Sequence, residues 1–316
     1  MSTGPRALLA VTLAIASLLR VDRACAESTP VTPLAPAVAA EPPAPSRRLP
    51  WVFPRFRAWE WAGSIATSIG SLAVEFGTDH IPDNHWRRGL FFDDNARDAL
   101  VARSSEGRAR AAKLSDVSWP IVQYFPIVDA IVTPLATDHG NLDTAFQLTL
   151  LNWESQSLAF LLTRSTHRLV GRSRPLVGAC NDTPSYDILC NPRATGRAAS
   201  MISGHTSMSF AGAGLTCAHH LAMPLYGARW ADIGTCVFML AGATTTGLLR
   251  MMADRHWASD VLLGAGVGLA TGWLMPWALH YARWNIRTAG RTTIEGTVMP
   301  SAMGTAGVGL TTAGLF

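Results

Sequence analysis

Residues 250–279 read RMMADRHWASDVLLGAGVGLATGWLMPWAL and join a charged stretch to an apolar one. Arg250–Asp260 holds two arginines, two aspartates and a histidine, whereas Val261–Leu279 holds no charged residue over 19 positions. An apolar run of that length, without strict alternation of polar residues, predicts a helix close to the ~20 residues that a membrane-crossing helix needs. If the charged stretch is helical as well, His256 and Asp260 lie on one face, four residues apart.

Further apolar stretches precede this one, and they too lack the alternation of a strand. They are Trp61–Val74, Val117–Ala136, Phe146–Thr163, Met208–Ala222 and Ile233–Leu249. The chain therefore predicts an all-α fold, a helical bundle of about six core helices. The tail, residues 291–316, is rich in Thr, Val and Gly and predicts a short C-terminal β-hairpin.

The glycines of GAGVG, Gly264–Gly268, stand inside the apolar run. A dinucleotide-binding loop would have to follow a strand, and none is predicted before these glycines. Small residues at this spacing instead allow two helix backbones to approach closely. We therefore expect this segment to pack tightly against a neighbouring helix.

Charged residues make up only 15% of the 316 residues, against about 25% in ordinary soluble domains. The formal net charge of +4 is spread along the chain without a basic stripe, so no nucleic-acid partner is predicted. Every basic residue except Lys113 is arginine, whose planar guanidinium suits anionic groups such as phosphate. The hydropathy alone does not decide whether the apolar helices cross a membrane or form a soluble core.

The N-terminal 26 residues have the pattern of a signal peptide, with Arg6 before an apolar core and ACA before Glu27. A Pro-rich linker is predicted over residues 27–54, a helical domain over 55–290 and a tail over 291–316. Export leads to an oxidising compartment, where cysteines pair. We expect a disulfide between Cys180 and Cys190, which flank a short polar loop. Cys217 and Cys236 lie in apolar stretches and are predicted to be buried free thiols.

Three polar motifs interrupt the apolar stretches. THRLVGRSRP, residues 166–175, holds three arginines, and SMISGHTSM, residues 200–208, opens an apolar run. Ser203 is a suitable N-cap residue, and the start of a helix offers free N–H groups to an anion. Together with residues 250–260, the motifs supply guanidinium groups, amides and two histidines, one near a carboxylate. Transfer of a phosphoryl group to an enzyme nucleophile needs these groups.

The motifs resemble those of the type 2 phosphatidic acid phosphatase and vanadium haloperoxidase superfamily. That family's pattern is Lys, six residues, Arg-Pro; then Pro-Ser-Gly-His; then Ser-Arg, five residues, His, three residues, Asp. The chain departs from it at three positions, where His167 replaces lysine, Ile202 replaces proline and Leu249 replaces serine. The positions that match the pattern are Arg174, Pro175, Ser203, Gly204, His205, Arg250, His256 and Asp260.

The resemblance implies a role for each matching residue. His256 is expected to be the nucleophile that forms a phosphohistidine, with Asp260 orienting it, and His205 to protonate the leaving alkoxide. Phosphate oxygens would be held by Arg174, Arg250, Ser203 and Gly204, assisted by His167 or Arg168. No metal and no cofactor are implied, and vanadate is expected to bind the phosphate site as an inhibitor.

The predicted function is that of a metal-independent phosphatase of the cell envelope that hydrolyses lipid phosphate or pyrophosphate esters. A phospholipid or an isoprenyl phosphate would be the substrate, and the protein would be exported and either inner-membrane-associated or periplasmic. Three alternatives stay open: a soluble periplasmic acid phosphatase, a vanadate-dependent haloperoxidase and a non-catalytic phosphate-binding envelope protein. The oligomeric state is not predicted. Outside the motifs, His219 and His220 are expected at a polar boundary, and His80 and His85 at the surface.

Overall fold

The computed structural model describes residues 47–77, 86–191, 194 and 196–282, and the backbone of three strands within 284–312. The predicted signal peptide, most of the predicted linker, and His80 and His85 lie outside the described residues. Residues 46–316 form one compact unit.

Long helices coincide with the apolar stretches of the sequence. They are α2 (Ala58–Gly77), α4 (Ser105–Thr137), α5 (Leu142–Leu169), α7 (Gly204–Ala222), α8 (Arg229–Met252) and α9 (Ala258–Leu269). Two π-helical turns, Ala270–Leu274 and Trp277–Tyr281, extend α9. Shorter elements connect them: α3 (Asp93–Leu100), α6 (Leu176–Asp182) and the 3-10 turns His139–Asn141 and Ile188–Cys190. The prediction of an all-α core is confirmed.

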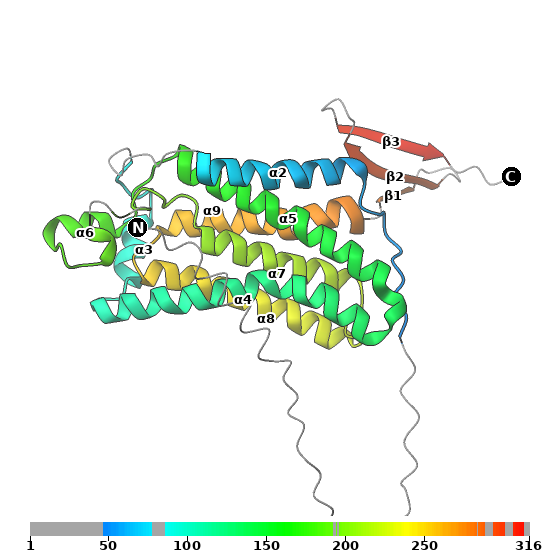
Figure 1. Cartoon of the computed structure of the whole chain (residues 1–316), viewed down its shortest axis with the longest axis horizontal. Coiled ribbons are helices and arrows are strands. Elements are labelled where there is room, and N and C mark those ends of the chain that lie inside the picture. Colours follow the sequence, from blue (N-terminus) through cyan, green and yellow to red (C-terminus); the bar gives the residue numbers. More distant parts are fainter. Residues whose placement is uncertain are drawn as a thin grey trace, which may run out of the picture. The chain divides into compact units, whose positions relative to one another are not determined.

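Helix α7 lies in the middle of the bundle, where it contacts α4, α5, α8 and α9 (Figure 1). Its side chains are buried around the whole circumference, which is typical of a central helix. Helix α2 packs on the outer side of α5. The short helices α3 and α6 lie together at one end of the bundle (Figure 1).

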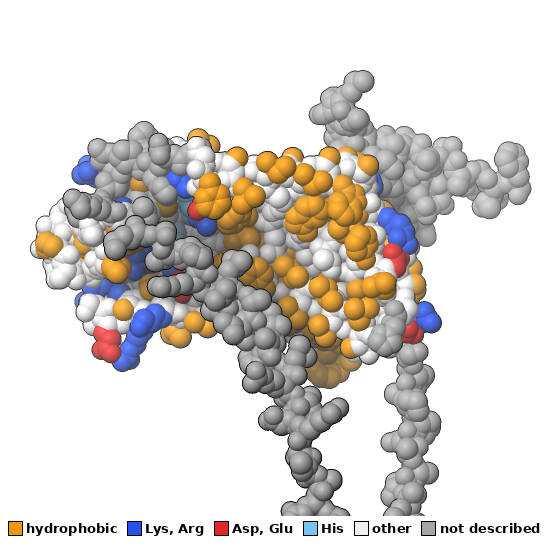
Figure 2. Space-filling view, in the orientation of Figure 1, with side chains coloured by type: hydrophobic (Ala, Val, Ile, Leu, Met, Phe, Trp, Pro, Cys, Tyr) orange, Lys and Arg blue, Asp and Glu red, His pale blue; other side chains and the backbone are white. Residues whose placement is uncertain are grey.

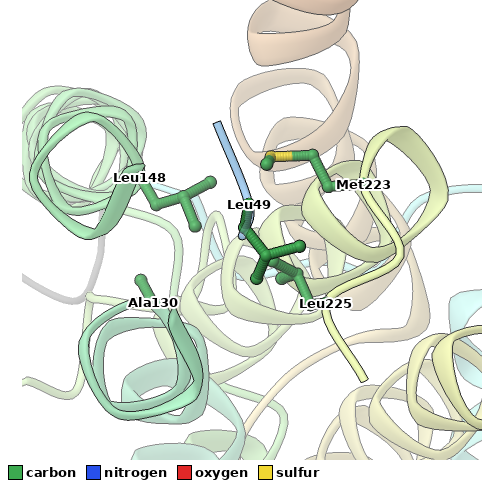
Figure 3. Packing of buried hydrophobic residues seen from close by; sticks show 5 residues of the cluster. All are labelled: Leu49, Ala130, Leu148, Met223 and Leu225. Carbon is green, nitrogen blue, oxygen red and sulfur yellow. The ribbon is translucent and has the colours of Figure 1, made fainter. Parts of the chain in front are cut away.

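The segment before α2 packs against the bundle. Leu49 is buried, and its side chain points into a cluster formed with Ala130, Leu148, Met223 and Leu225 (Figure 3). The backbone N–H of Leu49 donates to Asn141 Oδ1 at 2.8 Å, which fixes the segment to the start of α5. The last residues of the predicted linker are therefore part of the folded unit.

Helices α7 and α9 approach each other through glycine. A Cβ atom on Gly268 would lie 2.4 Å from the carbonyl oxygen of Ser207, and one on Gly264 would lie 2.9 Å from that of Ser203. These contacts involve backbone atoms of α7, which cannot move aside as a flexible side chain would. The expected close packing through Gly264–Gly268 is present, and Gly266 between them faces outward with no neighbour within 4 Å.

The described residues contain two disulfides. Cys180 and Cys190 are bonded as predicted and close the loop after α6. The prediction for the other pair is wrong: Cys217 of α7 and Cys236 of α8 form a second disulfide, with Cα atoms 4.5 Å apart. The sequence gives no indication of this because each cysteine sits in an apolar stretch, and only the packing of α7 beside α8 brings them together.

Histidines near the end of α7 are buried, so the prediction of boundary residues is wrong for both. His219 Nδ1 lies 2.8 Å from the hydroxyl of Tyr281. His220 contacts two carboxylates, Asp232 Oδ1 at 2.7 Å and Asp129 Oδ2 at 2.9 Å. Buried polar groups are tolerated where hydrogen bonds replace the lost water: both ring nitrogens of His220 have a partner, and Nδ1 of His219 has one.

The outer faces of the bundle are apolar. Helices α4, α8 and α9 with its extension are long and apolar enough to cross a membrane. Their outward side chains include Ile121 of α4, 61% exposed, and Phe238 of α8, 75% exposed. Figure 2 shows apolar side chains over the middle of the bundle on one face, with charged side chains toward its ends. An exposed apolar surface of this kind marks a protein associated with a membrane.

The C-terminal segment forms a three-stranded antiparallel sheet in the order β1-β2-β3. Its strands are β1 (Trp284–Arg287), β2 (Thr293–Pro300) and β3 (Ala306–Thr312). In the register of β2 and β3, Val298 faces Val308. The sequence predicted a two-stranded hairpin here, and the additional strand is the short β1, which precedes the Thr- and Val-rich tail.

The GAGVG segment offers a matched test of the α7–α9 contact. Gly268→Ala places a methyl group against the Ser207 carbonyl and should destabilise the fold by about 1–3 kcal/mol. Gly266→Ala has open space and should instead stabilise the helix by about 0.5–1 kcal/mol. Thermal unfolding of the two variants, followed by circular dichroism, measures both effects. Equal shifts for both would contradict the close approach.

Candidate active site

A cavity of about 390 Å³ lies where the three polar motifs meet, at the end of the bundle that carries α3 and α6. Each motif contributes to its wall: His167 and Arg174 from the first, Gly204 and His205 from the second, and His256 from the third. Motif residues up to 89 positions apart in sequence, His167 and His256, thereby line one space. Other parts of the wall are Glu75, Trp119, Gln123, Tyr124, Phe160, Thr163, Arg164, Arg168, Gly196, Ala199 and Met208.

His256 is buried in the loop between α8 and α9. Its Nδ1 lies 2.8 Å from the backbone oxygen of Ser200. A carbonyl oxygen can only accept, so Nδ1 carries the proton, and Nε2 of the neutral ring keeps its lone pair. Burial, together with the Arg174 and Arg250 cations, holds the pKa of His256 well below its ordinary value. The imidazole is therefore neutral and nucleophilic at Nε2 over the physiological pH range.

The position of Asp260 differs from the prediction. Helix α9 begins at Ala258, so His256 precedes the helix and does not share a helical face with Asp260. Asp260 Oδ2 accepts from Ser200 Oγ at 2.6 Å and from the backbone N–H of Trp257 at 3.1 Å. Ser200 thus stands between the two predicted partners. Asp260 holds the residue whose carbonyl orients His256, and it acts on the ring indirectly.

Arg172 lies behind Asp260 and is fully buried. Its Nη1 donates to Asp260 Oδ1 at 2.6 Å, and its Nη2 donates to Asp93 Oδ2 at 2.7 Å. The guanidinium also lies over the rings of Trp86 and Trp257, at 4.7 and 5.4 Å from their centroids. Charge-assisted hydrogen bonds and cation–π contacts together replace the hydration that burial removes.

Asp93, the first residue of α3, completes this buried group. Its carboxylate also accepts from the backbone N–H of Leu90 at 2.7 Å and from the N–H and hydroxyl of Ser259 at 2.8 and 2.7 Å. Burial tends to raise the pKa of Asp93, but these hydrogen bonds outweigh it and hold the pKa below its ordinary value. Asp93 is therefore ionised, and it anchors the cation that holds Asp260.

Two arginines of the motifs have a buried donor without a partner. Arg174 Nε and Arg250 Nε are buried and have no hydrogen-bond partner. Burial and the nearby Arg250 and Arg255 lower the pKa of Arg174 to about 9. Like charges held close together with open donors are costly unless an anion compensates them. The pair is therefore suited to bind a dianionic group such as phosphate.

His205, near the start of α7, occupies the other side of the cavity. Its Nε2 lies 2.8 Å from Asp116 Oδ1, and its ring lies 5.2 Å from that of Trp119. Arg250 Nη1 donates to the same Asp116 oxygen at 3.2 Å. Burial and the Arg250 and Arg174 cations lower the pKa of His205 to about 2. A bound phosphate would offset those cations and raise this pKa, which couples protonation of His205 to binding.

Ser203 and Gly204 form the start of α7. Ser203 is the N-cap residue as predicted, but its side chain caps no backbone N–H. Its Oγ accepts from the hydroxyl of Thr206 at 2.8 Å instead. The first N–H groups of a helix have no partner within the helix, so this helix start beside the cavity can offer amides to an anion.

His167 and Arg168 both line the cavity, and their contacts limit what each can do. His167 Nε2 lies 2.6 Å from the backbone oxygen of Ile202, so the proton is on Nε2 and the neutral ring has no second donor. Arg168 Nη2 donates to the backbone oxygen of Glu75 at 2.6 Å. Arg164, one turn earlier in α5, lies 3.3 Å from the carboxylate of Glu75. Fixed positive charge near the lysine position of the family thus comes from Arg164 and Arg168 together.

Several supporting residues were not predicted. Ser200 belongs to the second motif but was given no role there, whereas Asp93 and Asp116 lie outside the three motifs. Arg172 belonged to the arginine cluster, where it stands between Gly171 and Ser173.

Comparisons with known proteins agree with these motifs. Residues 157–284 match the model of the PAP2 superfamily. A lipid A 1-phosphatase of Porphyromonas gingivalis is 44% identical over 80 residues, which cover 24% of this chain and 15% of that protein. The chain thus matches only a small part of the relative's length. No solved structure matches the chain. The matched region contains all three motifs, and over that region the chain is similar to the PAP2 superfamily.

Proposed function

We propose that this protein is a metal-independent phosphatase of the cell envelope that hydrolyses lipid phosphate monoesters through a phosphohistidine intermediate. The observation that carries the proposal is the arrangement of His256 and His205 around one cavity. Arg174, whose buried Nε has no partner, lines the same space, and Arg250 donates to the Asp116 oxygen that contacts His205. The family match and the phosphatase named among its relatives support a phosphatase.

The first half-reaction forms a nitrogen–phosphorus bond. The lone pair of His256 Nε2 attacks phosphorus while the bond from phosphorus to the leaving alkoxide breaks. His205 gives its proton to the alkoxide, which departs as an alcohol. Arg174, Arg250 and the amides at Gly204 would compensate the charge on the phosphoryl oxygens, which is the largest requirement of such a transition state.

The second half-reaction returns the enzyme to its starting state. His205, now neutral, takes a proton from water as the water oxygen attacks phosphorus. The bond from phosphorus to His256 Nε2 breaks, and inorganic phosphate leaves. Ser200 keeps the proton of His256 on Nδ1 in both steps, so that Nε2 is the reacting atom throughout. Asp260 and Arg172 would hold Ser200 in that position.

The apolar surroundings favour a lipid as the substrate. Trp119, Phe160 and Met208 form part of the cavity wall, and three helices are long and apolar enough to lie in a membrane. The relative from Porphyromonas gingivalis is named for a phosphatase of lipid A. Activity on phosphatidic acid and lipid A in detergent micelles, compared with glycerol phosphate, tests this. Faster turnover of glycerol phosphate would support the soluble acid phosphatase instead.

The proposed roles of His256 and His205 predict that their alanine variants lose activity differently on two substrates. His256→Ala should abolish turnover and the radiolabelled phosphoenzyme on every substrate, because no other group can occupy the place of Nε2. His205→Ala should slow the turnover of lipid phosphates by about 10²–10⁴-fold. The turnover of p-nitrophenyl phosphate should fall much less, because p-nitrophenolate leaves without a proton. Steady-state kinetics on both substrates measure the difference. Equal losses of turnover on both substrates for His205→Ala would show that His205 is not the general acid.

The cations around His256 predict a shift in the pH profile. Arg174 helps to keep the pKa of His256 low, so the wild-type nucleophile stays neutral far into the acid range. Arg174→Gln removes one positive charge, raises that pKa and should move the acid limb of kcat/KM to higher pH. Because both enzymes are measured on one substrate, ionisation of the substrate cancels. A lower rate with an unmoved limb would contradict the electrostatic role of Arg174.

His167→Lys tests the departure from the family pattern. A fixed ammonium beside the cavity should strengthen phosphate binding and lower the inhibition constant of vanadate a few-fold, since a charge-assisted hydrogen bond contributes about 1.5–3 kcal/mol before desolvation. His167→Gln, which adds no charge, is the matched control. Unchanged vanadate inhibition in the lysine variant would indicate that Arg164 and Arg168 already supply the charge.

A further inference from the structure

A second cluster of ionisable side chains lies inside the bundle and shares no residue with the cavity wall. It consists of Glu60 of α2, Glu154 of α5 and His280 in the last π-helical turn. All three are buried, with relative exposures of 0%, 9% and 1%. One donor atom from each lies within 4.8 Å of the others. The mechanism proposed above uses none of them.

Two atoms of this cluster have no hydrogen-bond partner. Glu60 Oε1 and His280 Nε2 lie 2.8 Å apart, yet their orientation does not make a hydrogen bond, and both are buried and unsatisfied. His280 Nδ1 lies 2.9 Å from the backbone oxygen of Pro54, which can only accept. The proton is therefore on Nδ1, and a neutral His280 directs the Nε2 lone pair into the cluster. Two lone-pair atoms at this distance need a cation between or beside them.

The charges around this cluster also favour a bound cation. Arg57 is the basic side chain that contacts the cluster, with Nε 3.7 Å from Glu60 Oε2. Its Nη2 donates to the backbone oxygen of Leu279 at 2.8 Å. One guanidinium can compensate one of the two carboxylates, Glu60 and Glu154. An uncompensated carboxylate is costly in a buried site, and a bound cation removes that cost.

We propose that Glu60, Glu154 and His280 bind a divalent transition-metal ion, with Zn²⁺ the preferred ion. One imidazole nitrogen and two carboxylates are donors that Zn²⁺ accepts, and three protein ligands leave a position for water. Pro54 supplies the outer hydrogen bond that fixes the ring of a metal-binding histidine. The ion would connect the start of α2, the middle of α5 and the end of the α9 extension, and so stabilise the bundle away from the phosphate site.

Cobalt binding to the full chain tests this inference. The protein is purified without a polyhistidine tag, stripped with a chelator and titrated with Co²⁺, whose visible absorption reports the number and type of its ligands. We expect one Co²⁺ per chain, displaced by Zn²⁺, and a rise in the unfolding temperature with Zn²⁺. Glu60→Gln, Glu154→Gln and His280→Gln should each weaken Zn²⁺ binding by at least ~100-fold, the upper range for outer-ligand changes. His219→Gln, a buried histidine next to Tyr281, is the matched control and should bind normally.

Two results would overturn the inference. One is a wild-type chain that takes up no stoichiometric Co²⁺, in which case protons satisfy the cluster. The other is Co²⁺ binding that persists unchanged in all three glutamine variants. Should the variants fail to fold, X-ray absorption of Zn²⁺ in the wild-type chain decides: one imidazole with oxygen ligands supports the site, and any other ligand set rejects it. Phosphatase activity is not the readout, so failure here leaves the proposed function untouched.

Discussion

The pairing of Arg172 with two carboxylates is the interaction on which the candidate site depends. A buried guanidinium between Asp93 and Asp260 is stable only if both partners stay in place, because removing either leaves an uncompensated charge in the interior. Asp260 accepts a hydrogen bond from the hydroxyl of Ser200, and the backbone oxygen of Ser200 accepts one from the ring of His256. The tautomer of the nucleophile is thus set by a chain of polar contacts that begins in α3.

The same balance of charges divides the site into two halves. Behind His256, two carboxylates surround one arginine, whose Nη1 and Nη2 donate to them. In front of it, Arg174 and Arg250 keep donors without partners. A dianion entering the cavity would meet Arg174, while Arg250 is already held by the carboxylate of Asp116. Such preorganisation is what electrostatic catalysis requires, because little reorientation is needed when charge develops.

The sequence predicted the helices well because each apolar stretch needs a partner to bury it, and length alone separates helix from strand here. It also predicted which motif residues meet, since His205, His256 and Arg174 line one cavity. It did not predict contacts that depend on packing. The Cys217–Cys236 bond, the burial of His219 and His220, and the place of Ser200 between His256 and Asp260 all follow from which helix lies beside which. No pattern within one segment records that information.

The support of Arg172 by α3 has a consequence for the limits of the functional unit. The region that matches the family begins at residue 157, within α5, whereas Asp93, Asp116 and Trp86, the bridge partner of Arg172, all precede it. A fragment cut at the limits of the match would retain the motifs but lose the carboxylate that anchors Arg172. A shorter protein that contains the motifs therefore need not have a working site. The smallest autonomous piece has to begin before Trp86.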